Sequence, residues 1–251
     1  MTGVLAGRLA LVTGAGHGNG AAIAQGLAAA GAKVIVTDID KDAAHTIAEA
    51  IVKAGGDARS YTLDVTDEDG CAKLAADIAL LVGPIRILVN NAGIFLRGNL
   101  VAPDGRARWD RTMAVNVQGP FNVTMAFIDQ LKLTHGTIVN IASINSFIAP
   151  AGSGAYPVSK GAVAQFTRAL ATELAPDGVR VNALAPGIIA TAMTEATRAD
   201  PKKLEGFLTH VPMKRVGQPE ELVGPVVFLC SDAASYVTGA VLAVDGGYLA
   251  V

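Results

Sequence analysis

Residues 9–20 read LALVTGAGHGNG, and this stretch decides the fold. The apolar run Leu9–Val12 is typical of a buried strand, and an alanine-rich helical pattern begins at Ala21. A glycine has no Cβ, so a glycine-rich turn can bend sharply and let a ligand approach the backbone. The start of the following helix offers unpaired N–H groups and a positive dipole end to a phosphate. We therefore predict a phosphate-binding turn; the alternative is a tight turn without a ligand. The predicted contacts are Gly14, Gly16, His17, Gly18, Asn19 and Gly20.

The second apolar run, VIV at 34–36, ends at Asp38, eighteen residues after Gly20. An acidic residue at this place can accept both ribose hydroxyls of NAD and repels the 2′-phosphate of NADP. Ile39 follows, so no arginine stands next to Asp38 to neutralise a phosphate, and a mostly neutral His17 is a poor substitute. The sequence favours NAD over NADP; Asp38 as a plain turn residue is the alternative.

The same alternation of short β-branched runs and longer helical patterns continues to the C-terminus. Several runs are continuously apolar, as strands buried on both faces are. Seven strands alternating with six helices predict an α/β single-domain doubly wound (Rossmann) fold over 1–251, with a seven-stranded parallel sheet and helices on both faces. The predicted strands are Leu9–Val12, Lys33–Thr37, Arg59–Leu63, Ile85–Asn90, Thr137–Ala142, Arg180–Ala185 and Ala240–Val244. The predicted helices are Ala21–Ala30, Lys41–Ala54, Asp67–Leu81, Arg108–Leu133, Tyr156–Ala175 and Pro219–Cys230.

One segment, 188–218, does not follow this rhythm. It is too long for an ordinary connection in a compact domain, and such excursions are often functional. We predict a segment that covers the substrate; a merely variable excursion is the alternative.

Composition excludes several classes of protein. The chain has 251 residues, 51% of them hydrophobic, and a formal net charge of −2, so it is not disordered and carries no basic field for nucleic acid or anionic lipid. No apolar run approaches the ~20 residues of a membrane span. Two cysteines cannot form a disulfide framework, and the histidines lack metal-ligand spacing, so we predict no metal site. With no signal-peptide pattern at the start, a cytoplasmic location is expected.

Tyr156 and Lys160 are four residues apart at the start of a predicted helix, so they share one helix face. A free tyrosine has a pKa near 10. An ammonium beside the phenol would lower that pKa and let the phenol exchange a proton with a substrate oxygen. Such pairs also occur on ordinary helices, so the pair alone is a weak signal.

The positions of other residues strengthen the interpretation of Tyr156 and Lys160 as a catalytic pair, because the carboxyl ends of parallel strands line one ligand crevice. Ser143, the glycine turn, Asn90–Gly93 and Pro186–Gly187 all follow predicted strands. A hydroxyl at Ser143 could hold a substrate oxygen beside Tyr156; a helix-capping serine is the alternative.

On these residues the chain resembles the short-chain dehydrogenase/reductase family in its roughly 250-residue form. The matching motifs are TGAGHGNG at 13–20, NNAG at 90–93, Asn116 in MAVNVQG, Ser143, YPVSK at 156–160, PGIIAT at 186–191 and YVTGAVLAVDGG at 236–247. One departure is Asn19, where the family usually has Ile or Leu.

The resemblance implies a role for each matching residue. Tyr156 would be the general acid/base, and Lys160 would lower its pKa and hold the nicotinamide ribose. Ser143 would orient the substrate oxygen, and Asn116 would hold a water linking Lys160 to solvent. The remaining implied cofactor contacts are Asp64 and Val65 at the adenine, Asn91 at the adenine-side ribose, Ile189 at the carboxamide and Thr191.

The resulting functional prediction is an NAD-dependent oxidoreductase that interconverts a secondary alcohol and its ketone. The alternatives are a 3-oxoacyl carrier-protein reductase using NADPH and a non-catalytic dinucleotide sensor. Thr134 and Asp177 stand where such reductases tend to have arginine, and the intact tetrad disfavours a sensor. The residues expected to face substrate are mostly apolar and suggest a weakly polar carbonyl compound. They are Phe95, Ile144, Asn145, Phe147, Ile148, Met193 and Phe207.

Apolar positions on the predicted outer helix faces, and a C-terminal strand that ends without charged side chains, indicate surfaces that a partner covers. Self-association through twofold axes is the commonest solution, and many family members are tetramers. We therefore predict a homotetramer, with a dimer as the fallback. The positions used are Ala162, Phe166, Ala169, Leu170 and Tyr248–Val251.

Overall fold

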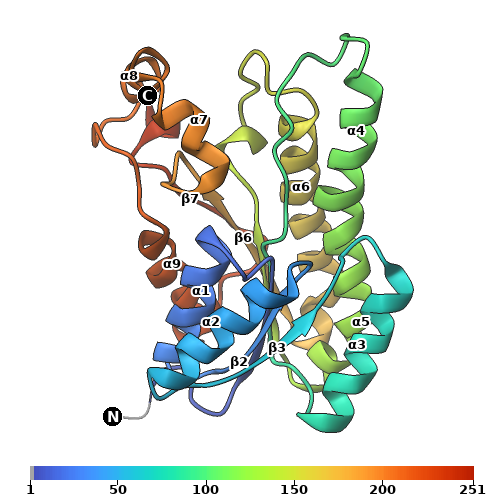
Figure 1. Cartoon of the computed structure of the whole chain (residues 1–251). Helices are drawn as coiled ribbons and strands as arrows, with labels where there is room; N and C mark the ends of the chain where they lie inside the picture. The colour runs from blue at the N-terminus through green and yellow to red at the C-terminus, as the bar shows by residue number, and fades with distance from the viewer. Residues whose placement is uncertain (1–2) are drawn as a thin grey trace.

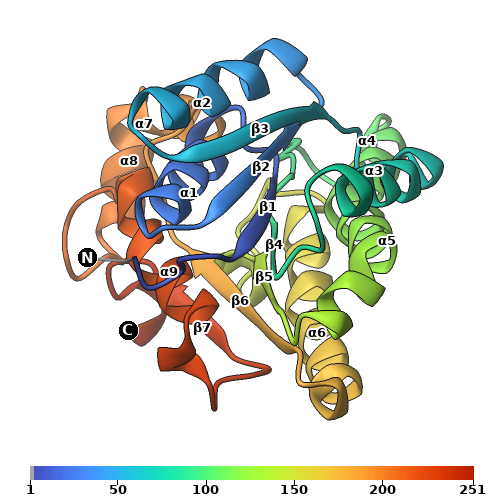
Figure 2. The same ribbon diagram turned by 90° about the horizontal axis from the view of Figure 1, so that it is seen from below.

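A computed structural model describes residues 3–251. Within them, seven parallel strands form one sheet in the order β3-β2-β1-β4-β5-β6-β7 (Figure 2). The strands are β1 (Leu9–Thr13), β2 (Lys33–Asp38), β3 (Asp57–Thr62), β4 (Ile87–Asn90), β5 (Thr137–Ile141), β6 (Arg180–Pro186) and β7 (Val241–Val244). The order reverses between β1 and β4, and a ligand crevice is expected at such a switch point, outside the carboxyl ends of the strands. The predicted doubly wound sheet is confirmed.

Helices cover both faces of the sheet (Figures 1 and 2). One layer holds α1 (Gly18–Ala29), α2 (Lys41–Lys53) and α9 (Val223–Cys230). The other layer holds α3 (Glu68–Leu81), α4 (Gly105–Met113), α5 (Gly119–Leu133) and α6 (Tyr156–Leu174). Two further short helices, α7 (Glu195–Arg198) and α8 (Pro201–Leu208), lie within the excursion between β6 and α9.

Strand β1 shows why the buried runs are continuously apolar. Side chains alternate across a strand, so Ala10 and Val12 enter the core under α1, while Leu9 and Leu11 enter the core under α5. Both faces of the strand are thereby buried.

The predicted helix Arg108–Leu133 is interrupted. A π-helical turn, 114–118, separates α4 from α5. Pro120 lacks the N–H that would bond to the carbonyl four residues earlier, at Asn116, and this loss favours a wider turn. The interruption was not predicted, and it lies at a candidate catalytic residue.

Leu170 corrects one expectation about the outer helix faces. Predicted to lie on the outer surface of α6, it is 4% exposed and packs in the core beneath α5. Phe166 is half-buried and contacts Phe121, whose ring is 6.1 Å away and 43% exposed. Among residues 3–251, no helix is long and apolar enough to cross a bilayer.

Candidate active site

The glycine-rich turn after β1 is shaped by contacts that leave no room for side chains. Gly14 and Gly18 have positive φ angles of 60° and 52°. A Cβ on Gly14 would lie 2.8 Å from the Cα of Ala92, in the turn after β4. The Asn91 side-chain amide donates to the carbonyls of Thr13 and Gly14, at 2.9 Å each. Asn91 thus fixes the turn, a role that the sequence did not indicate.

Asp38, at the end of β2, closes one end of this turn. Its Oδ2 accepts a hydrogen bond from the Gly16 N–H at 2.9 Å, and its Oδ1 accepts one from Asp40 N–H at 3.0 Å. Gly16 therefore positions the carboxylate rather than lining the cavity. Ile39, the next residue, lines the cavity and is 61% exposed.

Asp64 and Val65 follow β3 and line the same end of the cavity. Asp64 Oδ1 accepts from the Thr66 hydroxyl at 2.7 Å and from the Thr66 N–H at 2.9 Å. These bonds stabilise the charged form and lower the pKa of Asp64. The Val65 carbonyl accepts from the Asn122 amide at 3.1 Å, which ties this turn to α5.

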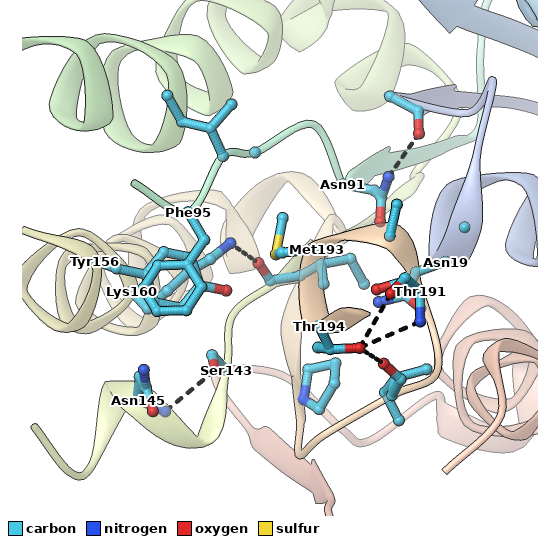
Figure 3. Close-up of a pocket in the computed structure, with 18 of the residues that line it drawn as sticks. Asn19, Asn91, Phe95, Ser143, Asn145, Tyr156, Lys160, Thr191, Met193 and Thr194 are labelled. Atoms are coloured by element: carbon cyan, nitrogen blue, oxygen red, sulfur yellow. Dashed lines mark hydrogen bonds between the residues drawn. The ribbon is translucent and has the colours of Figure 1, made fainter. Parts of the chain in front are cut away.

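Tyr156 and Lys160 project from the first turns of α6 into the middle of the cavity (Figure 3). Burial lowers the pKa of Lys160 to about 8, and its Nζ donates to the Ile141 carbonyl at 2.7 Å. Burial raises the pKa of Tyr156 to about 12, and the hydrogen bond with Ser143 acts in the opposite direction. The expected lowering by Lys160 is not observed, because desolvation dominates and Nζ, bonded to Ile141, lies 5.7 Å from the centre of the Tyr156 ring. The resting group is the protonated phenol.

Ser143 lies two residues past the end of β5 and is the N-cap of the short 3-10 helix 144–146. Its side chain is 7% exposed, and its Oγ accepts from the Asn145 N–H at 3.2 Å (Figure 3). This bond holds the hydroxyl at the cavity surface, which Tyr156 also lines.

Asn116 lies in the π-helical turn and is 1% exposed. Its Oδ1 accepts from the Ile94 N–H at 2.8 Å, while its Nδ2 donates to the Ile94 carbonyl at 2.9 Å and to the Ser159 hydroxyl at 3.0 Å. Asn116 does not line the cavity; it joins the turn after β4 to α6, beside Lys160. Its geometry is that of a positioning residue.

One cavity of about 750 Å³ brings these groups together, a size typical of ligand pockets. Most predicted site residues line it. They are Gly14, His17, Gly18, Asn19, Gly20, Asp38, Asp64, Val65, Asn91, Phe95, Ser143, Ile144, Asn145, Tyr156, Lys160, Ile189, Thr191, Met193 and Phe207. Phe147 and Ile148 do not line it; the 3-10 helix ends at Phe147, which is 50% exposed.

The mouth of the cavity is more polar than the sequence indicated. Arg97, Thr197, Lys203, His210 and Tyr248 also line it. Arg97 donates to the Thr197 hydroxyl at 2.5 Å, and its guanidinium carbon lies 4.7 Å from the centre of the Phe95 ring. Lys203 pairs with Asp200 at 3.0 Å, whereas Arg97 makes no ion pair within residues 3–251. These residues come from three separate segments, namely the loop after β4, the excursion 188–218 and the C-terminal turn, and no local motif connects them.

The excursion 188–218 forms part of the cavity wall. Arg198, at the end of α7, donates to the Thr191 carbonyl at 3.0 Å and to the Thr194 hydroxyl at 3.2 Å. Phe207 on α8 stacks on Tyr248, with ring centres 4.8 Å apart. Hydrogen bonds within the segment therefore fix its first part, and the contact between Phe207 and Tyr248 fixes its second part against the C-terminal turn.

The cavity suits a dinucleotide along its length. The glycine turn offers backbone at its surface, and a Cβ on Gly18 would approach the Thr191 methyl to 3.2 Å. Asp38, Tyr156 and Lys160 all line the cavity. The buried Asn19 Oδ1 has no hydrogen-bond partner in the described residues.

The chain belongs to the short-chain dehydrogenase/reductase family and is an NAD(P)-dependent oxidoreductase. A family model described as enoyl-(acyl carrier protein) reductase matches residues 14–249. The predicted family resemblance is therefore confirmed over nearly the whole chain.

Relatives named for different activities match the chain over nearly its whole length. The chain is similar to a galactitol 2-dehydrogenase (L-tagatose-forming) of Cereibacter sphaeroides, with 46% identity over 97% of this chain and 96% of the relative. It is 40% identical to a 3-oxoacyl-acyl-carrier-protein reductase, FabG, of Aquifex aeolicus, over 97% of this chain and 98% of the relative. Among solved structures, a gluconate 5-dehydrogenase from Burkholderia cenocepacia J2315, in complex with NADP and tartrate, has a TM-score of 0.94 and 36% identity, covering 98% of this chain and 97% of that one.

Proposed function

We propose that the protein oxidises a secondary hydroxyl of an acyclic polyhydroxylated substrate with NAD⁺, and catalyses the reverse reduction of the ketone. The observation that carries this proposal is the meeting of Tyr156, Ser143 and Lys160 with the polar mouth around Arg97 in one cavity. The first group supplies the chemistry, and the second supplies hydrogen-bond donors for a substrate rich in oxygen atoms.

Tyr156 handles the proton. With a pKa of about 12, the phenol is protonated at neutral pH and can donate to a ketone oxygen during reduction. In the oxidation direction the phenol first releases its own proton to solvent water, and the resulting phenolate oxygen receives the hydroxyl proton of the substrate. Ser143, which lines the same cavity, orients the substrate oxygen towards Tyr156.

Lys160 and Asn116 support this proton transfer. Lys160 is 5% exposed and bonded to Ile141, so its ammonium is fixed in place on the same face of α6 as Tyr156. Asn116 fixes the turn after β4 against Ser159, one residue before Lys160. We therefore assign it a positioning role, beside the water-holding role implied by the family.

A nicotinamide dinucleotide, when bound, accepts or donates the hydride. Its contacts in this chain would be the glycine turn, Asp38, Asp64, Val65, Asn91, Ile189 and Thr191. Asp38 supports the choice of NAD, because its carboxylate would repel a 2′-phosphate and no basic residue follows it. The gluconate 5-dehydrogenase structure contains NADP, so this choice is specific to the chain and requires its own measurement.

The polar mouth supports a polyhydroxylated substrate. Arg97 carries a guanidinium without a carboxylate partner in the described residues, and a guanidinium binds carboxylates and hydroxyls through several parallel donors. The names of two relatives, a galactitol dehydrogenase and a gluconate dehydrogenase, agree with such a substrate. The weakly polar carbonyl compound expected from Phe95, Met193 and Phe207 is less consistent with this mouth.

The 3-oxoacyl carrier-protein reductase is the second enzyme class, because one relative carries that name. An acidic carrier needs a basic docking surface. In this chain Asp177 forms an ion pair with Lys132 at 2.9 Å, and the Thr134 hydroxyl donates to the Ile85 carbonyl. Neither of these two positions provides a positive charge for an acidic carrier. The surroundings of Thr134 and Asp177 therefore favour a polyhydroxylated substrate over a carrier-bound 3-oxoacyl substrate.

Assembly and location belong to the same proposal. We keep the homotetramer as its assembly, since Phe121 and Met125 on α5 are 43% and 37% exposed and Phe121 packs against the half-buried Phe166. Light scattering after gel filtration tests it; a monomer near 25.5 kDa would contradict it. A cytoplasmic location stays a prediction.

The experiment that tests the function is a substrate panel followed by absorbance of the reduced cofactor. Galactitol, D-gluconate and cyclopentanol are offered with NAD⁺ and NADP⁺, and a 3-oxoacyl thioester is offered with NADH and NADPH. The proposal predicts the highest kcat/KM with NAD⁺ and one of the two polyhydroxylated compounds. A highest value for the thioester with NADPH would overturn it.

A further inference from the structure

The loop after β4 carries an aromatic ring into the active site. Phe95 lines the cavity, and the centre of its ring lies 4.6 Å from that of Tyr156, with an angle of 37° between the two ring planes (Figure 3). Aromatic rings whose centres lie about 4.5–7 Å apart in a tilted arrangement attract each other. The proton transfer assigned to Tyr156 makes no use of this contact, so its role in the reaction is open.

Asn116 fixes the beginning of this loop. Its side chain bonds to the N–H and to the carbonyl of Ile94, the residue before Phe95, at 2.8 Å and 2.9 Å. The same side chain donates to the Ser159 hydroxyl at 3.0 Å, and that hydroxyl donates to the Tyr156 carbonyl at 2.8 Å. One buried amide therefore joins the backbone that carries Phe95 to the backbone that carries Tyr156.

Backbone contacts fix the other end of the loop. The Gly98 N–H donates to the Gly152 carbonyl at 2.8 Å, and Gly98 also forms a parallel bridge with Ser153. The Ser153 carbonyl in turn accepts from the Tyr156 N–H at 3.2 Å. The segment that carries Phe95 is thus attached at both ends to the start of α6, and these attachments hold the two rings together.

Charged groups approach this pair of rings from two elements. On α6, Lys160 Nζ lies 5.7 Å from the centre of the Tyr156 ring. On the loop after β4, the Arg97 guanidinium carbon lies 4.7 Å from the centre of the Phe95 ring. Burial is the largest influence on the pKa of Tyr156 and raises it to about 12, while Ser143 acts in the opposite direction. A change in the apolar cover of the phenol should therefore change its ionisation. The other acidic and basic side chains that line the cavity are His17, Asp38, Asp64, Arg111, Lys203 and His210.

We propose that Phe95 is a positioning residue for the proton transfer: its ring holds the Tyr156 ring in one orientation and keeps water from the part of that ring which it covers. This role rests on the proposed function, in which Tyr156 exchanges the proton, and goes beyond the substrate contact expected from the sequence. Proton transfer requires the phenol oxygen within hydrogen-bond distance of the substrate oxygen, so a misplaced ring slows it. Phe95 acts through Tyr156 and takes no part in the bond changes.

Two variants separate the orientation of Tyr156 from the exclusion of water. Phe95→Ala removes both the aromatic contact and the cover. Phe95→Leu keeps an apolar side chain beside Tyr156 but lacks the flat ring. Phe228→Ala is the matched control, because Phe228 on α9 is 41% exposed and does not line the cavity. A melting curve of each variant verifies folding.

The first measurement needs neither substrate nor cofactor. 3-Fluorotyrosine replaces the four tyrosines, and the fluorine NMR resonance of Tyr156 is identified by its absence in Tyr156→Phe. Fluorine lowers the pKa of a phenol and so brings its ionisation closer to neutral pH. In Phe95→Ala we expect the Tyr156 resonance to titrate at lower pH than in the wild type, because water reaches the ring and stabilises the phenolate. In Phe95→Leu and Phe228→Ala it should titrate as in the wild type.

The second measurement is steady-state oxidation with NAD⁺ and whichever of galactitol, D-gluconate and cyclopentanol is turned over fastest. In Phe95→Leu we expect kcat to fall by about 2- to 10-fold, the range of one aromatic pair, with KM nearly unchanged. In Phe95→Ala the rate should rise with pH at lower pH values than in the wild type, since the phenolate accepts the hydroxyl proton in this direction. Phe228→Ala should keep the wild-type kcat and pH profile.

Two results would overturn this role of Phe95. One is an unchanged titration of the Tyr156 resonance in Phe95→Ala. The other is a raised KM with unchanged kcat in Phe95→Leu, which would make Phe95 a substrate contact only. A wild type that turns over none of the three alcohols contradicts the proposed function instead. The fluorine titration still decides whether Phe95 covers Tyr156, so the two failures are distinguishable.

Discussion

The two halves of the cavity are built in different ways. The half around the glycine turn is made by strand ends: Gly14, Asp38 and Asn91 follow β1, β2 and β4, and hydrogen bonds within the protein fix each one. The half around Arg97 is made by side chains from segments that the topology brings together, with Phe207 of α8 stacked on Tyr248 near the C-terminus. We infer that the first half selects the cofactor and the second selects the substrate, while Tyr156 and Lys160 lie between them.

The largest effect on catalysis is expected at Tyr156, which lies between the two halves of the cavity. Tyr156→Phe removes the hydroxyl that exchanges the proton and leaves the ring, which packs 4.6 Å from Phe95. We expect kcat to fall by about 10²- to 10⁴-fold, as for other general acid/base groups. NADH affinity, measured by fluorescence titration, should be nearly unchanged. A variant with near-full activity would show that the proton takes another route.

The next effect is confined to the cofactor half. Asp38→Ala removes the acceptor for the ribose hydroxyls and the charge that repels a 2′-phosphate. We expect the ratio of kcat/KM for NADH to that for NADPH to drop by about 10- to 100-fold, of the order of one or two charge-assisted hydrogen bonds. Steady-state rates with one ketone substrate give the ratio. A wild type that turns over NADPH as well as NADH would contradict the assignment before any mutation.

A smaller effect is expected in the substrate half. Arg97→Leu keeps an apolar contact with Phe95 and removes the guanidinium. We expect KM for D-gluconate to rise by about 10-fold or more, the value of a hydrogen bond to a charged group, and KM for uncharged galactitol to rise less. Lys203→Leu is the matched control, because Lys203 is already paired with Asp200. An equal response of the two substrates would mean that Arg97 does not contact the acid group.

The smallest effect concerns the excursion over the mouth. Phe207→Ala removes the stacking on Tyr248, and aromatic pairs contribute about 0.5–1.5 kcal/mol beyond their buried area. We expect a rise in substrate KM of a few-fold with unchanged NADH affinity, and faster proteolysis within 188–218. A loss of NADH affinity larger than the change in KM would argue that this segment closes over the cofactor instead.

The same contrast explains what the sequence could predict. Strand alternation, the glycine turn and Asp38 are local patterns with local physical causes, so the sheet and the cofactor half were predictable. The π-helical turn at Asn116 was not, because its cause is Pro120 acting across a pattern that otherwise reads as one helix. Arg97, His210 and Tyr248 were missed since their meeting depends on loop paths rather than on spacing. The pKa of Tyr156 was expected to fall, and it rises because burial outweighs the lowering effect of Ser143.

The most direct test of this division of labour is a double-mutant cycle of Asp38→Ala and Arg97→Leu. The kcat/KM for D-gluconate oxidation by NAD⁺ is measured for the wild type, both single variants and the double variant. Independent halves predict additive effects within about 0.5 kcal/mol, roughly a factor of two, as for separate sites without shared partners. A coupling above about 1.4 kcal/mol, a tenfold departure from additivity, would show that the two halves act as one site and would contradict the account.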